Sequence, residues 1–245
     1  MDKKRKFNDW SKKTVNFCTG CENDCLYCYA KGMSIRFGQV KEGEWSKMRI
    51  REHDVKKEHR DYGELVMFPS SHDITPKVLD EAVVVLGNLL KVGNDVLVVS
   101  KPRYECIKRL CDKFLDYKDK ILFRFTIGAI NNDILSFFEP GAPRYEERKE
   151  ALKYAFDNGF NTSVSAEPVL DINNVIDLFF DLEPFVSETI WIGKVNHVRK
   201  NIKVKSPGVD RVVKEQCQEN CDLVFELLNK EPKVRFKTGF INEKK

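Results

Sequence analysis

Four of the eight cysteines in this chain lie within eleven positions, at Cys18, Cys21, Cys25 and Cys28. The last three have the spacing C-x3-C-x2-C, and Tyr27 stands directly before the last of them. Three thiolates on one loop can bind three irons of a [4Fe–4S] cube and leave the fourth iron without a protein ligand. An open iron can chelate a small molecule, so this spacing predicts a cluster that takes part in chemistry.

Two other metal sites stay open for the same loop. The four cysteines together have the pattern C-x2-C-x3-C-x2-C, which could bind zinc, although zinc-binding pairs usually stand about 12–20 residues apart. A four-cysteine electron-transfer cluster would use Cys18 as its fourth ligand. We interpret Cys21, Cys25 and Cys28 as the ligands and Cys18 as a neighbour of the cluster.

The segment TGCENDCLYCYA (19–30) resembles the cluster motif of the radical S-adenosylmethionine (SAM) superfamily. The resemblance implies that the free iron takes the amino and carboxylate groups of SAM. One electron would then cleave SAM to a 5′-deoxyadenosyl radical, which abstracts hydrogen from a substrate. It also implies that Tyr27 lies near the adenine and that a flavodoxin or ferredoxin supplies the electron.

A second stretch narrows the resemblance. Residues 137–160, FFEPGAPRYEERKEALKYAFDNGF, are similar to the E-P-x-x-P…E-R…A-L…G stretch of the spore photoproduct lyase-like branch. The similarity covers roughly residues 14–195, and the last fifty residues match no family that we can name. It implies a lyase-like reaction and favours a nucleotide or nucleic acid as the substrate.

The segment PSSHDIT (69–75) follows the second expected strand, where many members of the superfamily carry a Gly-Gly-Glu. The resemblance makes Ser70, Ser71 and Asp73 candidates for binding SAM, because they can accept hydrogen bonds from its ammonium group. Asp73 could instead cap the next helix. Photoproduct lyases have a hydrogen-donating cysteine here that this chain lacks, and His72 is a weak catalytic candidate or an ordinary polar residue.

Three more candidates stand at the ends of later strands. Lys101 follows Ser100 as in the Ser/Thr-Lys pair that the family uses for the SAM carboxylate, and Thr126 matches a ribose or methionyl contact. Glu167 faces the expected pocket and could contact cofactor or substrate. A solvated lysine and a structural ion pair for the glutamate are the alternatives.

The remaining cysteines form two helix-spaced pairs. Cys106 and Cys111 stand among apolar residues of a helical pattern, so we expect them in the core. Cys217 and Cys221 are spaced to share one face of a C-terminal helix, and their thiols are weak candidates for donating a hydrogen atom.

Strand and helix patterns alternate from residue 64 onward. A first strand is expected at 14–17, before the cysteines, and the charged stretch 33–63 has no clear pattern. We expect strands at 64–69, 95–100, 121–127, 161–168, 188–195 and 233–240, and helices at 75–93, 103–117, 144–158, 171–182 and 210–229.

Mostly non-alternating apolar strands separated by helices are typical of a parallel sheet. We therefore expect an α/β fold, a partial (β/α)6-type barrel with helices outside, whose functional residues gather where strands end. Residues 1–13 would form a basic N-terminal arm and 14–245 a single domain, with a core at 14–195 and a C-terminal extension at 196–245.

The composition sets wider limits. The 245 residues carry 42 Lys and Arg against 38 Asp and Glu, a net charge of +4 that permits an acidic partner without requiring one. Phosphates could be attracted by the segment KNIKVK (200–205) and by the basic residues of the arm, Lys3, Lys4, Arg5, Lys6, Lys12 and Lys13. Trp10 could stack on a base. The alternative is that these residues form solvated surface. No apolar run reaches the ~20 residues of a membrane span and no apolar segment follows the basic start, so we expect a cytoplasmic protein.

These observations favour a radical SAM enzyme that uses a [4Fe–4S] cluster and SAM, with a nucleotide or nucleic-acid substrate. One alternative is a non-catalytic iron–sulfur or zinc module that binds nucleic acid. The other is a radical SAM enzyme acting on a peptide or small metabolite.

Overall fold

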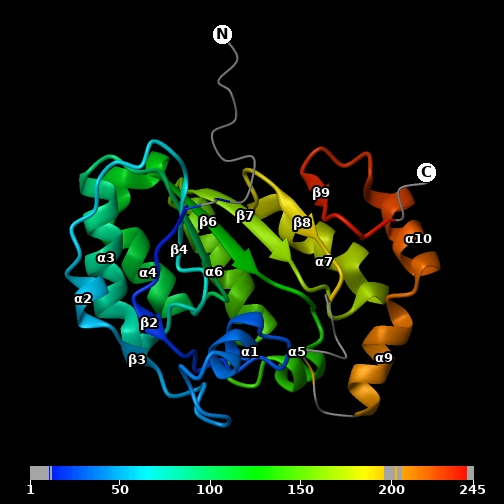
Figure 1. The fold of residues 1–245 in the computed structure, drawn as a ribbon. Helices are drawn as coiled ribbons and strands as arrows, with labels where there is room; N and C mark the ends of the chain where they lie inside the picture. The colour runs from blue at the N-terminus through cyan, green and yellow to red at the C-terminus, as the bar shows by residue number, and fades with distance from the viewer. Residues whose placement is uncertain (1–10, 12, 196–201, 203–205, 242–245) are drawn as a thin grey trace.

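A parallel β-sheet forms the centre of the protein, in a computed structural model that describes residues 11, 13–195, 202 and 206–241 (Figure 1). The sheet has seven strands in the order β1-β4-β5-β6-β7-β8-β9, and every neighbouring pair is parallel. Their bounds are Lys13–Thr14 (β1), Val66–Phe68 (β4), Val96–Ser100 (β5), Ile121–Thr126 (β6), Asn161–Ala166 (β7), Ile190–Ile192 (β8) and Val234–Phe236 (β9).

The strands follow one another across the sheet in chain order. Each connection therefore moves one strand further in the same direction, as in a (β/α) barrel. The two edge strands, β1 and β9, do not pair with each other, so the sheet is open. The expectation of a partial barrel with parallel strands is confirmed.

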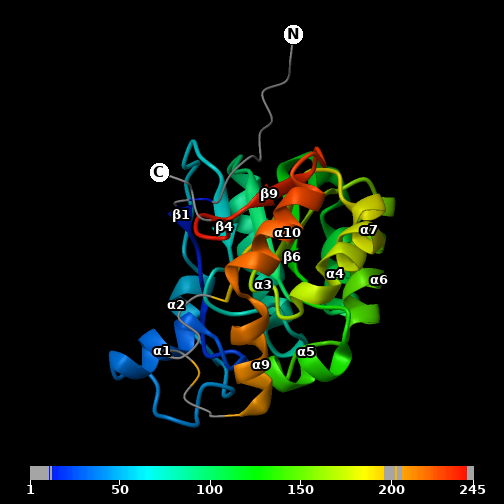
Figure 2. The same ribbon diagram turned by 90° about the vertical axis from the view of Figure 1, so that its right-hand side faces the viewer.

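Helices cover the outer face of the sheet and one of its edges. The longer ones are α3 (Leu79–Lys91), α4 (Tyr104–Lys113), α6 (Tyr145–Asp157), α7 (Val175–Leu182), α9 (Pro207–Glu215) and α10 (Gln218–Leu228). α10 packs against α7 beside β9 (Figure 2). Short 3-10 turns extend these helices at Pro76–Val78 (η1), Leu115–Lys120 (η2), Ile172–Asn174 (η3) and Glu183–Phe185 (η4).

The segment between β1 and β4 carries the cysteines. Its elements are β2 (Cys18–Thr19), α1 (Tyr29–Arg36), β3 (Arg49–Ile50) and α2 (Glu52–Val55). β2 and β3 form a small antiparallel pair in which Cys18 lies opposite Ile50. The charged stretch that had no clear pattern thus supplies β3 and α2, and β3 supports the start of the cysteine loop.

The two faces of the central strands differ in chemistry. Phe123 and Phe125 are fully buried in the main hydrophobic core, which the outer helices complete. Arg124, which lies between these two residues in the sequence, is buried on the other face of the strand. Its Nε donates to Ser163 Oγ at 3.0 Å. β6 and β7 are thus buried along both faces, as mostly non-alternating strands predict, but polar side chains such as Arg124 and Ser163 occupy part of their inner face.

Two helix predictions need correction. The expected helix at 210–229 is divided into α9 and α10, because the Gln216 side chain between them bonds to the loops after β7 and β8. Its Nε2 donates to the Val169 carbonyl at 2.5 Å, and its Oε1 accepts from the Val195 N–H at 2.9 Å. The sequence analysis also missed α5 (Asn132–Phe138), which the Asn131 side chain caps. None of the helices among the described residues has the length and apolar character needed to cross a membrane.

Candidate active site

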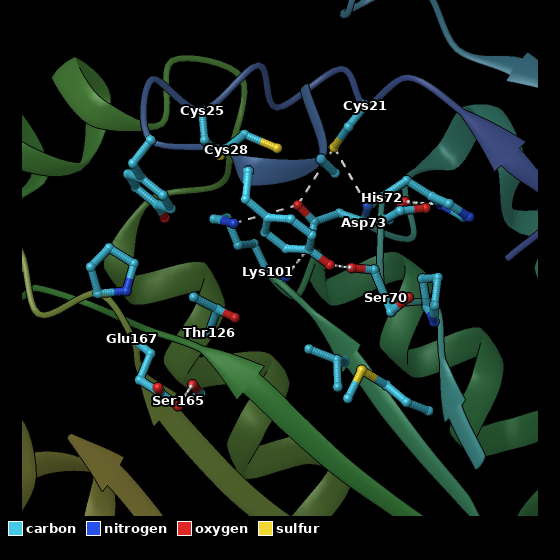
Figure 3. A pocket seen from close by; sticks show the side chains of 18 of the residues that line it. Cys21, Cys25, Cys28, Ser70, His72, Asp73, Lys101, Thr126, Ser165 and Glu167 are labelled. Carbon is cyan, nitrogen blue, oxygen red and sulfur yellow. Dashed lines mark hydrogen bonds and ion pairs between the residues drawn. The ribbon is translucent and has the colours of Figure 1, made fainter. Parts of the chain in front are cut away.

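One cavity of about 560 Å³ lies at the carboxyl ends of the strands, under the cysteine loop (Figure 3). Six strands, β4 to β9, each contribute residues at or just after their ends. The cavity brings together eleven of the thirteen residues that the sequence singled out: Cys21, Cys25, Tyr27, Cys28, Ser70, Ser71, His72, Asp73, Lys101, Thr126 and Glu167. The strand ends thus assemble the site as a (β/α) barrel predicts.

The three cysteines of the C-x3-C-x2-C pattern line this cavity, and Cys18 does not. Cys18 is fully buried in the main hydrophobic core instead. Burial raises the pKa of Cys25 to about 12, so its thiol is protonated in the metal-free protein. Cys28 begins α1, and its sulfur accepts the Lys31 N–H at 3.4 Å.

The donor set fits a multi-iron cluster. Among the residues that the structure describes, no three His, Cys, Asp or Glu side chains are gathered closely enough to hold a single metal ion. The three thiols line one cavity, and in an iron–sulfur cube each cysteine binds a different iron, so they need not converge on one point. With three cysteines at the cavity, one iron of such a cube would have no cysteine ligand.

The 137–160 stretch anchors the cysteine loop. The Leu26 N–H donates to the Phe138 carbonyl at 2.8 Å, and the Tyr27 hydroxyl donates to the Glu139 carboxylate. Glu139 in turn pairs with Arg148 of α6 at 2.6 Å, and neither of these two side chains is exposed. Glu139 of the E-P part and Arg148 of the E-R part thus form a buried ion pair, and this pair holds the cysteine loop through Tyr27.

Gly141 brings the two segments into close contact. Its N–H donates to the Asn23 carbonyl at 3.1 Å, and its carbonyl accepts from Arg103 at 2.6 Å. A Cβ at this position would lie 2.2 Å from the Glu22 carbonyl oxygen. Only glycine allows this approach of two backbones.

Asp73 and Lys101 form a buried pair beside Cys21 (Figure 3). Asp73 Oδ1 accepts the Lys101 N–H at 2.7 Å, Asp73 Oδ2 accepts from Asn23 at 2.8 Å, and the Lys101 ammonium lies 3.6 Å from Oδ2. Burial alone would raise the pKa of Asp73, but Lys101 and these hydrogen bonds lower it. The Asp73 carboxylate thus bonds to Lys101 and Asn23 and not to the start of the next helix, so the alternative that it caps this helix is wrong. Thr75, at the start of η1, makes no side-chain capping bond either.

Asn16 shapes the segment after β4. Its carboxamide oxygen accepts the N–H groups of Ser70 and Ser71 at 2.8 and 3.0 Å, and its NH2 group donates to Ser70 Oγ at 2.9 Å.

The next residue, His72, is buried against the Phe17 ring, and its Nδ1 lies 3.1 Å from the Asp73 carbonyl. Burial lowers the pKa of His72 to about 4, so its imidazole is neutral at pH 7.

Glu167 stands across the cavity from the cysteines (Figure 3). Its carboxylate accepts from Ser165 Oγ at 3.1 Å and lies 3.7 Å from the Lys237 ammonium. Burial raises the pKa of this carboxyl group. Thr126, at the end of β6, lines the space between Glu167 and Lys101.

Some expected residues lie elsewhere, and some lining residues were missed. Cys217 is exposed at the start of α10, Cys221 is buried within that helix, and neither lines the cavity. Lys194 and Lys237 do line it, directly after β8 and β9. Both lie in the C-terminal halves of expected strands, 188–195 and 233–240, and that position was the signal that could have found them. Lys3, Trp10 and most of the 200–205 segment lie outside the described residues.

The chain is similar to known proteins over much of its length. A family model described as the radical SAM superfamily matches residues 15–177. An uncharacterised protein of Acidianus two-tailed virus is 29% identical over 192 residues, which are 73% of this chain and 63% of that protein. An uncharacterised protein of Methanocaldococcus jannaschii is 24% identical over 179 residues, which are 72% of this chain and 68% of that protein. The matched region thus spans less than two thirds of the viral relative.

Solved structures share the fold. A cysteine-to-alanine variant of spore photoproduct lyase with a dinucleoside spore photoproduct has a TM-score of 0.57 and 14% identity, covering 96% of this chain and 80% of that chain. SuiB of Streptococcus suis bound to S-adenosylmethionine has a TM-score of 0.54 and 10% identity, covering 91% of this chain and 49% of that chain. The chain belongs to the radical SAM superfamily of enzymes.

Proposed function

We propose that this chain is a radical SAM enzyme that holds a [4Fe–4S] cluster on Cys21, Cys25 and Cys28. The observation that carries the proposal is that these three thiols line one cavity with the ends of six strands, while Cys18 is buried in the core. When bound, the cluster supplies the electron that cleaves SAM to a 5′-deoxyadenosyl radical, which abstracts hydrogen from the substrate.

The residues around the cavity have complementary charges for the amino-acid part of SAM. Lys101 would receive its carboxylate and Asp73 its ammonium group, with Ser70 and Ser71 close by. The internal pair of Lys101 and Asp73 holds both charges in place beforehand, since each is buried and neutralises the other.

Other cavity residues would hold the rest of the cofactor or the substrate. Tyr27 would lie near the adenine, and Thr126 would contact the ribose or methionyl part. Glu167 would contact cofactor or substrate. We assign His72 a structural role, because its neutral ring packs on Phe17 and bonds to the Asp73 carbonyl.

We infer a nucleotide or nucleic acid as the substrate and a flavodoxin or ferredoxin as the electron donor. The net charge of +4 and the fold shared with spore photoproduct lyase support this substrate. A peptide is the second candidate, since the fold is also shared with SuiB, which was solved with a precursor peptide. Deuterium transfer from labelled substrates into 5′-deoxyadenosine distinguishes the two.

The first test is anaerobic iron–sulfur reconstitution, reduction with dithionite in the presence of SAM, and assay for 5′-deoxyadenosine. Wild type and Cys18→Ala should give product, and Cys28→Ala should give none. Cys106→Ala, a second core cysteine, is the matched control for loss of a buried thiol. Loss of the cluster in Cys18→Ala, or a reduced cluster that never cleaves SAM, would favour a four-cysteine binding module instead.

A further inference from the structure

The wall of the cavity formed after β8 and β9 is built by a part of the chain that the family model does not match. The match ends at residue 177, whereas Lys194, Val195 and Lys237 of this wall lie beyond it. Lys237 follows β9, which pairs with β8 and extends the sheet by one strand. This wall therefore lies outside the part of the chain that the family model matches, and it can set specificity.

The charges of this wall are predominantly positive. The Lys237 ammonium lies 3.7 Å from the Glu167 carboxylate and 5.0 Å from the centre of the Trp191 ring. Lys194 donates to Gln218 Oε1 at 3.0 Å, and that acceptor is neutral. The Trp191 ring also contacts a second cation, because the buried Arg124 guanidinium lies 5.6 Å from the centre of this ring. Two cations, Lys194 and Lys237, thus line this side of the cavity, where Glu167 is the carboxylate that pairs with Lys237.

The second carboxylate of the cavity does not reduce this excess. Asp73 lies on the side of the cysteines and is paired with Lys101, so it does not neutralise Lys194 or Lys237. A partly enclosed space with excess positive charge concentrates anions, because low-dielectric walls focus the field. Two ammonium groups that project from different strand ends can each donate several hydrogen bonds to a group with several anionic oxygens.

We propose that Lys194 and Lys237 bind a phosphate group of the substrate at the β8–β9 side of the cavity. The proposal rests on the proposed function, because it identifies the substrate class of that same site. A nucleotide or nucleic acid supplies such a phosphate. An acidic peptide would present carboxylates, and it is an outcome that the test can detect.

The test measures binding to the full chain, anaerobically with an oxidised cluster, with and without SAM. The probes are uridine 5′-monophosphate and uridine, which differ only by the phosphate, together with a short glutamate-rich peptide. We expect uridine 5′-monophosphate to bind more tightly than uridine. Lys194→Gln or Lys237→Gln should each weaken its binding about tenfold, as loss of a charge-assisted hydrogen bond does.

Lys230→Gln is the matched control, because Lys230 is an exposed lysine of the same C-terminal part and does not line the cavity. It should leave the affinity unchanged. Equal binding of uridine and its monophosphate, or unchanged affinity in both cavity variants, would overturn the proposal, and so would a preference for the acidic peptide. Because the cluster stays oxidised, this result is independent of SAM cleavage. A wild type that binds the nucleotide but makes no 5′-deoxyadenosine would overturn the proposed function alone.

Discussion

The guanidinium of Arg148 lies 2.6 Å from the carboxylate of Glu139, and both side chains are completely buried. The pair joins α6 to the cysteine loop, because Glu139 also accepts the hydroxyl of Tyr27. A buried pair adds little net stability compared with well-packed apolar side chains, but removing one partner leaves an uncompensated charge in the interior. The pair therefore makes the cysteine loop depend on a distant helix.

Replacing Arg148 by methionine should lower the free energy of unfolding by about 3–5 kcal/mol, because the Glu139 charge loses its partner. Urea unfolding, followed by circular dichroism, measures the change. Lys153→Met is the control, since the pair of Lys153 with Asp157 is exposed and should change the free energy by less than about 1 kcal/mol. Similar losses in the two variants would show that burial of the Arg148 pair does not matter.

Gly141→Ala should separate the cysteine loop from its anchor. The new methyl group would meet the Glu22 carbonyl oxygen, so the backbones must move apart at a cost of about 1–3 kcal/mol. We expect a lower free energy of unfolding and less iron per chain after reconstitution. The control is Gly32→Ala within α1, where a Cβ meets nothing within 4 Å and should stabilise by about 0.5–1 kcal/mol. Normal iron content in Gly141→Ala would show that the loop holds the cluster without this contact.

Lys101→Gln should weaken SAM binding at least about tenfold, because it removes the charge-assisted contact that we propose with the SAM carboxylate. It should also destabilise the free protein, since Asp73 would lose the ammonium beside it. Equilibrium dialysis with labelled SAM measures the first effect and urea unfolding the second. Lys108→Gln, at an exposed position on α4, should change neither. Destabilisation with unchanged SAM affinity would assign Lys101 a structural role only.

His72 should make the protein sensitive to mild acid. In the unfolded chain a histidine has a pKa near 6.5, whereas burial lowers the pKa of His72 to about 4. Between these values the unfolded state binds more protons than the folded state. The stabilising contribution of the neutral His72 is therefore complete above about pH 6.5 and declines as the pH falls toward 4.

The decline should reach about 1.4 kcal/mol per pH unit within that window. His72→Phe removes this titration. As the pH falls from 7 to 4.5, the free energy of unfolding of the wild type should therefore decrease relative to that of the variant. Parallel pH profiles for the two proteins would contradict the buried, neutral imidazole.

Much of the site follows from local patterns. The spacing of Cys21, Cys25 and Cys28 and the positions of Lys101 and Thr126 after apolar runs predicted the side chains that meet in the cavity. This works because parallel strands all deliver their carboxyl ends to one edge of the sheet. The sequence predicted that Cys18 is a neighbour of the cluster and not a ligand, and the structure shows that it packs in the core.

Other features depend on contacts between distant parts of the chain. Glu139 and Arg148 were visible as a motif, but nothing near them in sequence indicates that they hold Tyr27. The division of the last long helix depends on Gln216 reaching backbone groups of Val169 and Val195. The polar inner face of β6 could have been recognised from the alternation around Arg124, in which aromatic residues flank one charge.

The contact of Tyr27 with Glu139, which holds the cysteine loop, has a consequence for biosynthesis. Tyr27 and Glu139 are separated by 112 positions. At about 5–20 residues per second, roughly 6–22 s pass on the ribosome between the synthesis of the two. During that interval the nascent chain already carries its three cysteines, but the α5–α6 segment that fixes their loop does not yet exist. A cluster on these cysteines would therefore gain its anchored loop only after the Arg148 region has left the exit tunnel.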